Sequence, residues 1–179
     1  ADHGGGLELL EDRAAGGARN LPVPRDFNDS ELDFLMEHAV LPLARQFDSQ
    51  ALGVTCGVYG LAGDPLSRLA LSNVGLWGAV ERLVAEYPRA AVLGGGGYNP
   101  WTVIRCWSGL WGRLCAHELP ATLPPNGQEM LAGLDCDLID PDEVPEAWIT
   151  TLADPPNPGA VRPEVARLPE QVLDQACAA

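Results

Sequence analysis

The chain has 179 residues and a formal net charge of −14, which argues against a nucleic-acid-binding protein, because such proteins need clustered lysine and arginine to neutralise phosphates. All 11 basic residues are arginine, so the chain offers no lysine for a Walker phosphate loop, a Schiff base or a nucleophile. A hydrophobic content of 46% is typical of a globular protein with one self-supporting core.

The first part of the chain predicts an entry loop followed by a helix. Residues 1–20 are rich in glycine, alanine and acidic side chains, and prolines at positions 22 and 24 favour extended chain over a central strand. Asn-Asp-Ser-Glu from Asn28 is a helix-start signal, and apolar residues follow at helical spacing as far as Leu43. Pro42 is expected to bend or interrupt this helix.

Two short apolar runs, residues 51–56 and 90–93, predict buried parallel strands, each followed by a loop and a helix. Ser72 or Asn73 is expected to cap the first helix, and Asn99 the second, with Pro100 at its first position. The apolar face expected on the second helix consists of Trp101, Ile104, Trp107, Leu110, Trp111 and Leu114.

This β-loop-α-β-loop-α order predicts an α/β core over residues 21–118 with a right-handed crossover. Residues 119–179 are expected to form a proline-rich tail with short helices, near residues 128–134 and 163–176. We interpret 1–179 as one domain.

Four glycines, Gly94 to Gly97, follow the second predicted strand, and Tyr98 stands directly before the helix start. This order places bare backbone and a phenol at the carboxyl edge of the sheet, where α/β proteins bind ligands. The run fails the dinucleotide-binding pattern, because Asn99 stands where its third glycine would be. The residues alone leave two interpretations: a site that something approaches closely, or a packing turn with a core tyrosine.

Other chemical signals are weak. The three histidines are scattered, so a complete metal site from this chain alone is not expected, and no Gly-x-Ser-x-Gly elbow is present. The acidic residues between positions 135 and 143 lack calcium-loop spacing and predict a solvated loop. Five cysteines without a Cys-x-x-Cys pair favour buried thiols in a reducing compartment. No apolar stretch is long enough to span a bilayer, so we expect a cytoplasmic protein that does not bind membranes.

Two segments resemble the histone deacetylase superfamily. The first contains Cys56-Gly57, Gly60-Leu61, Gly63-Asp64-Pro65-Leu66-Ser67 and Leu69-x-Leu71-Ser72, and the second contains Leu93-Gly94-Gly95-Gly96-Gly97-Tyr98-Asn99 and Arg105-Cys106-Trp107. The tail motifs Trp148-x-Thr150-Thr151-Leu152 and Pro158-Gly159-x-Val161-Arg162-Pro163-Glu164 are similar to those of bacterial acetoin-utilisation deacetylases. From about Asn20 to Arg162, the chain resembles the carboxyl-terminal half of such an enzyme. The resemblance implies part of a doubly wound, parallel-sheet α/β fold of the arginase/deacetylase type.

The resemblance also implies roles for individual residues. Tyr98 would be catalytic, donating a hydrogen bond to the acetyl carbonyl and stabilising the oxyanion. Gly96 and Gly97 would form the wall of the acyl-lysine tunnel, and Leu66 would lie near its rim. Tyr59 stands where the family has an aspartate that binds zinc.

A phenol at that position is a poor zinc ligand, because it must first lose its proton, and its bulk would intrude on the metal pocket. Asp64 matches a different family position and is not expected to replace the missing carboxylate. The family's paired histidines and its Asp-x-His ligands belong to the other half of the fold, and nothing here matches them.

Two functions follow as expectations from the resemblance. In the first, the chain is a catalytically impaired half-domain that acts as a structural or interaction subunit, without zinc. The alternative is an active zinc-dependent deacetylase of an acetylated lysine or amine, with zinc held mainly by a partner chain. Both need a protein partner carrying the amino-terminal half, because two buried parallel strands need neighbours. The net charge of −14 would suit a cationic amine substrate.

Overall fold

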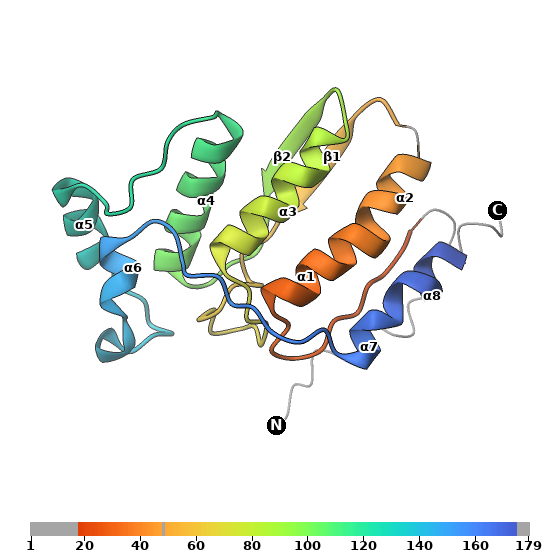
Figure 1. Ribbon diagram of the computed structural model, residues 1–179. Coiled ribbons are helices and arrows are strands. Elements are labelled where there is room, and N and C mark those ends of the chain that lie inside the picture. The colour runs from red at the N-terminus through yellow and green to blue at the C-terminus, as the bar shows by residue number, and fades with distance from the viewer. Residues whose placement is uncertain (1–17, 48, 175–179) are drawn as a thin grey trace.

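Helices packed against a two-stranded parallel sheet make up the structure (Figure 1). The computed structural model describes residues 18–47 and 49–174, so most of the expected entry loop lies outside the described residues. The elements are α1 (Asp29–Leu35), the π-helical turn η2 (Met36–Val40), α2 (Leu41–Gln46), β1 (Leu52–Cys56), α3 (Asn73–Ala85), β2 (Ala90–Gly94), α4 (Pro100–Leu114), α5 (Pro125–Ala132), η3 (Pro141–Glu143, 3-10), α6 (Glu146–Thr150), α7 (Pro163–Ala166) and α8 (Leu168–Asp174).

The predicted helix starts are confirmed by their capping contacts. Asn28 and Glu31 form a reciprocal capping box at the start of α1. The Ser72 side chain accepts a hydrogen bond from the Gly75 N–H at the start of α3, and Asn99 accepts from the first turn of α4. The expected interruption near Pro42 takes the form of η2, a π turn directly before the α2 segment that contains this proline.

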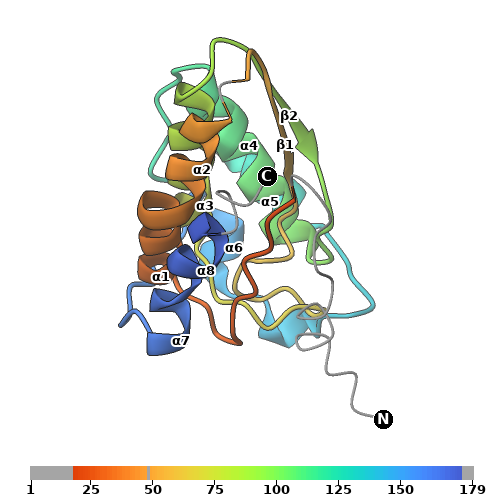
Figure 2. The same cartoon turned by 90° about the vertical axis from the view of Figure 1, so that its right-hand side faces the viewer.

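Both predicted strands are present and pair in parallel, with Leu52 opposite Ala90 and Cys56 opposite Gly94. The residues at positions 22 and 24 lie in extended connecting chain and not in a strand. Helices α3 and α4 lie on one side of the sheet (Figure 2). On the other side the paired positions Gly53–Ala91 and Thr55–Leu93 are exposed, and no described helix covers them in this view.

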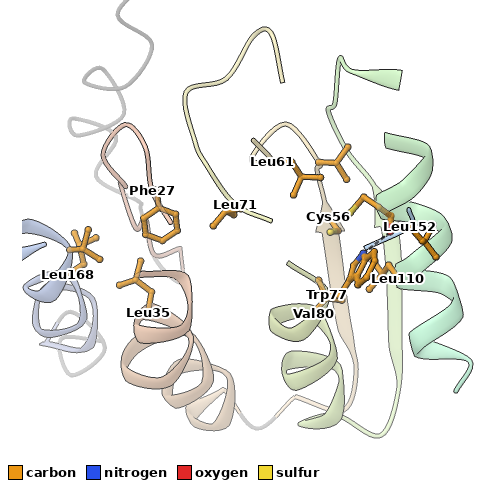
Figure 3. Packing of buried hydrophobic residues seen from close by; sticks show 13 residues of the cluster. Phe27, Leu35, Cys56, Leu61, Leu71, Trp77, Val80, Leu110, Leu152 and Leu168 are labelled. Atoms are coloured by element: carbon orange, nitrogen blue, oxygen red, sulfur yellow. Dashed lines mark hydrogen bonds between the residues drawn. The ribbon is translucent and has the colours of Figure 1, made fainter. Parts of the chain in front are cut away.

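The main core lies between the sheet, α1, α3 and α4 (Figure 3). Trp77 of α3 is fully buried there, and its indole N–H donates to the Cys106 carbonyl at 2.8 Å. The tail contributes Leu152, Val165 and Leu168 to the same cluster, and its last two helices pack with the first helical segment, α7 with α1 and α8 with η2. The predicted tail helices are present with shifted ends, and the last one breaks into α7 and α8.

The predicted buried face of α4 is partly wrong. Trp111 and Leu114 are 63% and 39% exposed, whereas Arg105 and Cys106 are fully buried. Arg105 is tolerated in the core because its guanidinium donates to the Thr151 carbonyl at 2.7 Å and pairs with a tail carboxylate. Polar partners in the tail therefore turn α4 away from the face that apolar spacing alone predicts.

The expectation of buried thiols is also only partly correct. Cys56 and Cys106 are buried, but Cys115 is exposed and Cys136 half-buried, because both follow the helices into surface connections. The fifth, Cys177, lies outside the described residues. Within residues 18–47 and 49–174, no helix combines the length and apolarity needed to cross a membrane.

Candidate functional site

The loops that follow β1 and β2 meet at the carboxyl edge of the sheet. The backbone N–H groups of Val58 and Tyr59 both donate to the Gly96 carbonyl, at 2.6 and 3.1 Å. A Cβ on Gly95 would lie 2.8 Å from the backbone of Gly57, so only glycine allows this approach. The glycine run therefore joins the two loops by direct backbone contact.

Two tyrosine rings lie against this joined backbone. A Cβ on Gly96 would lie 3.1 Å from Cδ1 of Tyr59 and 3.8 Å from Cε2 of Tyr98. Tyr59 also lies over Gly57, where an added Cβ would be 2.6 Å from its Cε1. Tyr59 and Tyr98 are 50% and 49% exposed as whole residues, so each side chain is partly open to solvent and partly covered.

Asp64 fixes the backbone next to Tyr98. Its buried carboxylate accepts hydrogen bonds from the Tyr98 N–H at 2.8 Å and from the Leu66 N–H at 3.0 Å. The Asn99 side chain also connects the two loops, because it donates a hydrogen bond to the Gly63 carbonyl at 2.9 Å. The loop after β1 thus sets where the tyrosine of the second loop stands.

A tryptophan from the tail supports this loop from outside. Gly63 has a φ of +87°, and the Trp148 ring occupies the space a Cβ would need, 2.5 Å from that position. Trp148 stacks in turn on Trp101 of α4, with ring centroids 6.5 Å apart. Helix α6, which carries Trp148, thereby takes part in shaping the site.

The structure brings together three of the five predicted site residues, Tyr59, Gly96 and Tyr98. Leu66 is connected to them through Asp64, and its side chain is 63% exposed. At Gly97, the side chains of Val58 and Val103 occupy the space that a Cβ would need. The catalytic and substrate-binding roles of these residues stay predictions.

The described residues do not fit a zinc site. No group of three or more histidine, cysteine, aspartate or glutamate side chains lies together within residues 18–47 and 49–174. The Asp64 carboxylate, which contacts the Tyr98 backbone, already accepts hydrogen bonds from two backbone donors. A metal bound here would need ligands from outside the described part of the chain.

The surroundings of Tyr98 are acidic. The Cys136 thiol lies 3.8 Å from the Tyr98 carbonyl, which places the loop carrying Asp135 and Asp137 beside the site. No lysine or arginine occurs between Arg113 and Arg162, the stretch that contains this loop. This neighbouring stretch therefore contributes acidic and no basic side chains to the edge of the site.

Sequence reasoning missed two contributors to the site. Asp64 was considered only as a replacement zinc ligand, although aspartate in a turn commonly accepts the N–H two residues on, as it does from Leu66. Its contact with Tyr98, 34 positions away, has no local signal. The position of Trp148 under Gly63 is equally non-local, because it depends on how the tail folds back.

The fold and site define the class of protein as α/β with parallel strands. Its glycine-tyrosine loop lies at the carboxyl edge of the sheet, which is where proteins of this class bind their ligands. The histone deacetylase domain family matches residues 3–114, and the chain belongs to this family. The family resemblance predicted from the motifs is therefore confirmed.

Solved structures extend the likeness over most of the chain. An HDAC homologue from Aquifex aeolicus is 31% identical with a TM-score of 0.79, and an HDAC homologue complexed with SAHA is 30% identical with a TM-score of 0.78. Each match covers 86% of this chain but only 41% of the solved one. The predicted arginase/deacetylase-like α/β fold is confirmed, and the chain forms part of it.

Curated relatives show the same partial coverage. Histone deacetylase HOS1 of Saccharomyces cerevisiae is 33% identical over 91 residues, which is 50% of this chain and 19% of that protein. Histone deacetylase 1 of Oryza sativa is 31% identical over 107 residues, 60% of this chain and 21% of that protein. The matched region thus spans about a fifth of these relatives.

Proposed function

We propose that this chain is a half-domain of a histone-deacetylase-like protein, completed by a partner chain and impaired in zinc-dependent hydrolysis. The observation that carries the proposal is Tyr59, whose ring lies on Gly57 and Gly96 at the position where the family resemblance calls for a zinc-binding carboxylate. The chain then acts as a structural or interaction subunit.

The need for a partner is supported by the sheet. Each strand is paired on one side only among the described residues, and buried parallel sheets have both faces covered. The open face presents Gly53, Thr55, Ala91 and Leu93, with Leu93 58% exposed. Uncharged side chains of this kind are typical of a face that another layer covers. The 41% coverage of the solved homologues agrees with a missing remainder of the fold.

The loss of zinc chemistry is supported by the ligand chemistry of tyrosine. A carboxylate binds zinc in its ordinary ionised state, whereas a phenol must first be deprotonated. A catalytic zinc site usually has three protein ligands, so one replacement leaves two. The ring also fills the space over the backbone of Gly57 and Gly96.

The alternative is an active deacetylase of an acetylated lysine or amine, assembled with a partner that supplies the remaining zinc ligands. One observation favours it: Tyr98 is held at the sheet edge by the buried Asp64 carboxylate. A phenol held in place in this way is the arrangement needed to stabilise an oxyanion.

Metal content and turnover of the native complex test the proposal. The chain is purified with whatever polypeptide co-elutes, zinc is quantified by elemental analysis, and hydrolysis of an acetyl-lysine peptide is followed. We expect substoichiometric zinc and no turnover, and we expect Tyr59→Asp to raise the zinc content.

Stoichiometric zinc, together with turnover that Tyr98→Phe abolishes, would establish the active enzyme and refute the impaired subunit. A chain that is a stable, compact monomer without any partner would refute the half-domain itself. Tyr87→Phe is the matched control, because it removes a phenol that precedes β2, at the opposite end of the strand from the glycine loop, and whose hydroxyl donates to the Ala44 carbonyl.

A further inference from the structure

We propose that the partner chain docks along the outer edge of β2 and the neighbouring side of α4, and that it adds a parallel strand there. This surface, the β2 flank, consists of the backbone of Ala90 and Val92 and the side chains of Trp107, Trp111 and Leu114. This mode of docking rests on the proposed function, because it needs the partner chain that completes the half-domain.

The outer edge of β2 has backbone groups free to pair with another strand. Among the described residues the sheet consists of β1 and β2, so each strand has one unpaired edge. Leu52 lies opposite Ala90, and its N–H donates to the Arg89 carbonyl at 2.9 Å. In a parallel ladder every second residue of a strand bonds to the same neighbour, so the backbone groups of Ala91 also point to β1. Those of Ala90 and Val92 point the other way, where a further strand can bind them.

A line of apolar side chains on α4 lies beside this edge. A Cβ on Gly97 would be 2.9 Å from the Val103 side chain. Further back along β2, a Cβ on Gly94 would be 3.8 Å from the Trp107 ring. Trp111 follows Trp107 by one helical turn and therefore lies on the same side of α4. Figure 1 shows α4 on the side of β2 that faces away from β1.

The apolar side chains at the end of this line are more exposed than their spacing predicts. Trp111 is 63% exposed and Leu114 is 39% exposed, although apolar residues at helical spacing are expected to face a core. The Trp111 ring contacts the His117 ring, with centroids 5.1 Å apart, and still stays mostly open. The described sheet ends at β2, so this side of α4 has no strand to cover. A strand paired with β2 would lie under Trp111 and bury it.

The β2 flank favours an uncharged strand. Residues 90–94 carry no charged side chain, and Arg113 of α4 is already paired with Glu81. A charged side chain on the incoming strand would lose water beside Trp111 without gaining a partner. A parallel strand buried on both faces is typically a continuous run of valine, isoleucine and leucine. The occupant is therefore a partner segment of this kind, and the 59% of the solved homologues that this chain does not match leaves room for it.

Two variants of the native complex test the β2 flank. Trp111→Glu places a charge under the expected strand, and Ala90→Pro removes an outward N–H at the first residue of β2, where proline is tolerated. Each full chain is purified with its co-eluting polypeptide, and light scattering after size-exclusion chromatography measures the particle. We expect both variants to bind the partner about tenfold more weakly or worse, and to keep the native circular dichroism spectrum. Met130→Glu is the matched control, because Met130 is 54% exposed on α5, and it should assemble like the native chain.

Hydrogen exchange gives a second measurement that does not depend on particle size. The amides of residues 90–94 should exchange more slowly in the native complex than in the Trp111→Glu chain, because the partner strand protects them. Equal exchange in the two would overturn the strand pairing. Native affinity in either Trp111→Glu or Ala90→Pro would overturn the β2 flank, as would an equal loss of assembly in Met130→Glu.

These outcomes differ from failure of the proposed function. That failure appears as a native chain that is a stable monomer, or as a complex with stoichiometric zinc and turnover. A native complex that survives both changes in the β2 flank would keep the half-domain and remove only this docking surface.

Discussion

The Asp64 carboxylate accepts a hydrogen bond from the backbone N–H of Tyr98 at 2.8 Å, and it does so while buried. Its other oxygen accepts from the Leu66 N–H at 3.0 Å. One side chain thus satisfies donors on both loops at the sheet edge, and it links the position of the Tyr98 phenol to the turn after β1.

Asp64→Ala should destabilise the protein by about 1–3 kcal/mol, because two backbone donors lose their acceptor in a buried place. For a chain of this size that corresponds to a fall in Tm of about 3–10 °C, measured by circular dichroism. Asp64→Asn keeps one acceptor and should lose about half as much. Tyr98→Phe is the control, because its hydroxyl has no partner within the described residues and its removal should change the Tm by no more than about 1 °C. If Tyr98→Phe lowered the Tm as much as Asp64→Ala, the role assigned to the Asp64 hydrogen bonds would be contradicted.

Gly63→Ala should be costly for two reasons. Its φ of +87° is unfavourable for alanine by about 1–2 kcal/mol, and the new methyl group would displace the Trp148 ring. We expect a lower midpoint in urea and a changed near-ultraviolet tryptophan signal. Gly53→Ala is the matched control, because nothing lies within 4 Å of its Cβ position, and it should change stability by less than about 1 kcal/mol. Equal effects at the two glycines would show that Trp148 does not pack here.

The ion pair between the buried Glu31 and the half-buried Arg162 makes stability depend on pH. Arg162 donates to both Glu31 oxygens at 2.6 Å, and this hydrogen bonding lowers the pKa of Glu31 below its ordinary value. Because the folded-state pKa lies below the unfolded one, the stabilisation is present at neutral pH. It is lost as the pH falls from the ordinary glutamate range through the lowered pKa.

Arg162→Ala should cost about 3 kcal/mol at pH 7, because it leaves the Glu31 carboxylate buried without its cation. The difference from the native chain should shrink in acid, where Glu31 takes up a proton, and urea unfolding at several pH values measures it. Arg25→Ala is the control, because Arg25 forms an exposed ion pair with Asp26. This replacement should change the free energy of unfolding by less than about 1 kcal/mol. A constant Arg162 effect from pH 7 to acid would refute the coupling.

Leu93→Glu should prevent assembly with the partner without unfolding the chain. Leu93 is 58% exposed on the open face of the sheet, so a charge there costs little until another layer covers it. Light scattering after size-exclusion chromatography should show a smaller particle than the native complex. Phe47→Glu is the control: Phe47 is 57% exposed at the end of α2, and its replacement should leave the assembly intact. An unchanged particle in Leu93→Glu would rule out this face as the interface.

Thiol reactivity should separate the cysteines by burial. Burial raises the pKa of Cys56, and burial together with the neighbouring Cys56 raises the pKa of Cys106 to about 12. At pH 8 both stay protonated and enclosed, so iodoacetamide should modify them only after denaturation. Cys115, which is exposed, should react in the folded protein. Peptide mass spectrometry resolves the sites, and rapid labelling of Cys106 in the native state would contradict its burial.

The local features were readable from sequence because their causes are local. Asn28, Ser72 and Asn99 cap helices through contacts within three residues, and the two apolar runs became the two strands. The motif around Tyr98 identified the family, since its glycines and phenol follow one another without a gap. The replacement at Tyr59 was likewise visible in a single stretch of sequence.

Only the tertiary structure decided which of these residues meet. The position of Tyr59 against Gly96 requires two loops to fold onto each other, and Asp64 and Trp148 support these loops from distant positions in the sequence. The buried face of α4 was mispredicted because the partners of Arg105 come from the tail. Hydrophobic spacing shows where a residue prefers to be buried, but a buried charge or a shared backbone contact depends on partners that only the folded chain brings together.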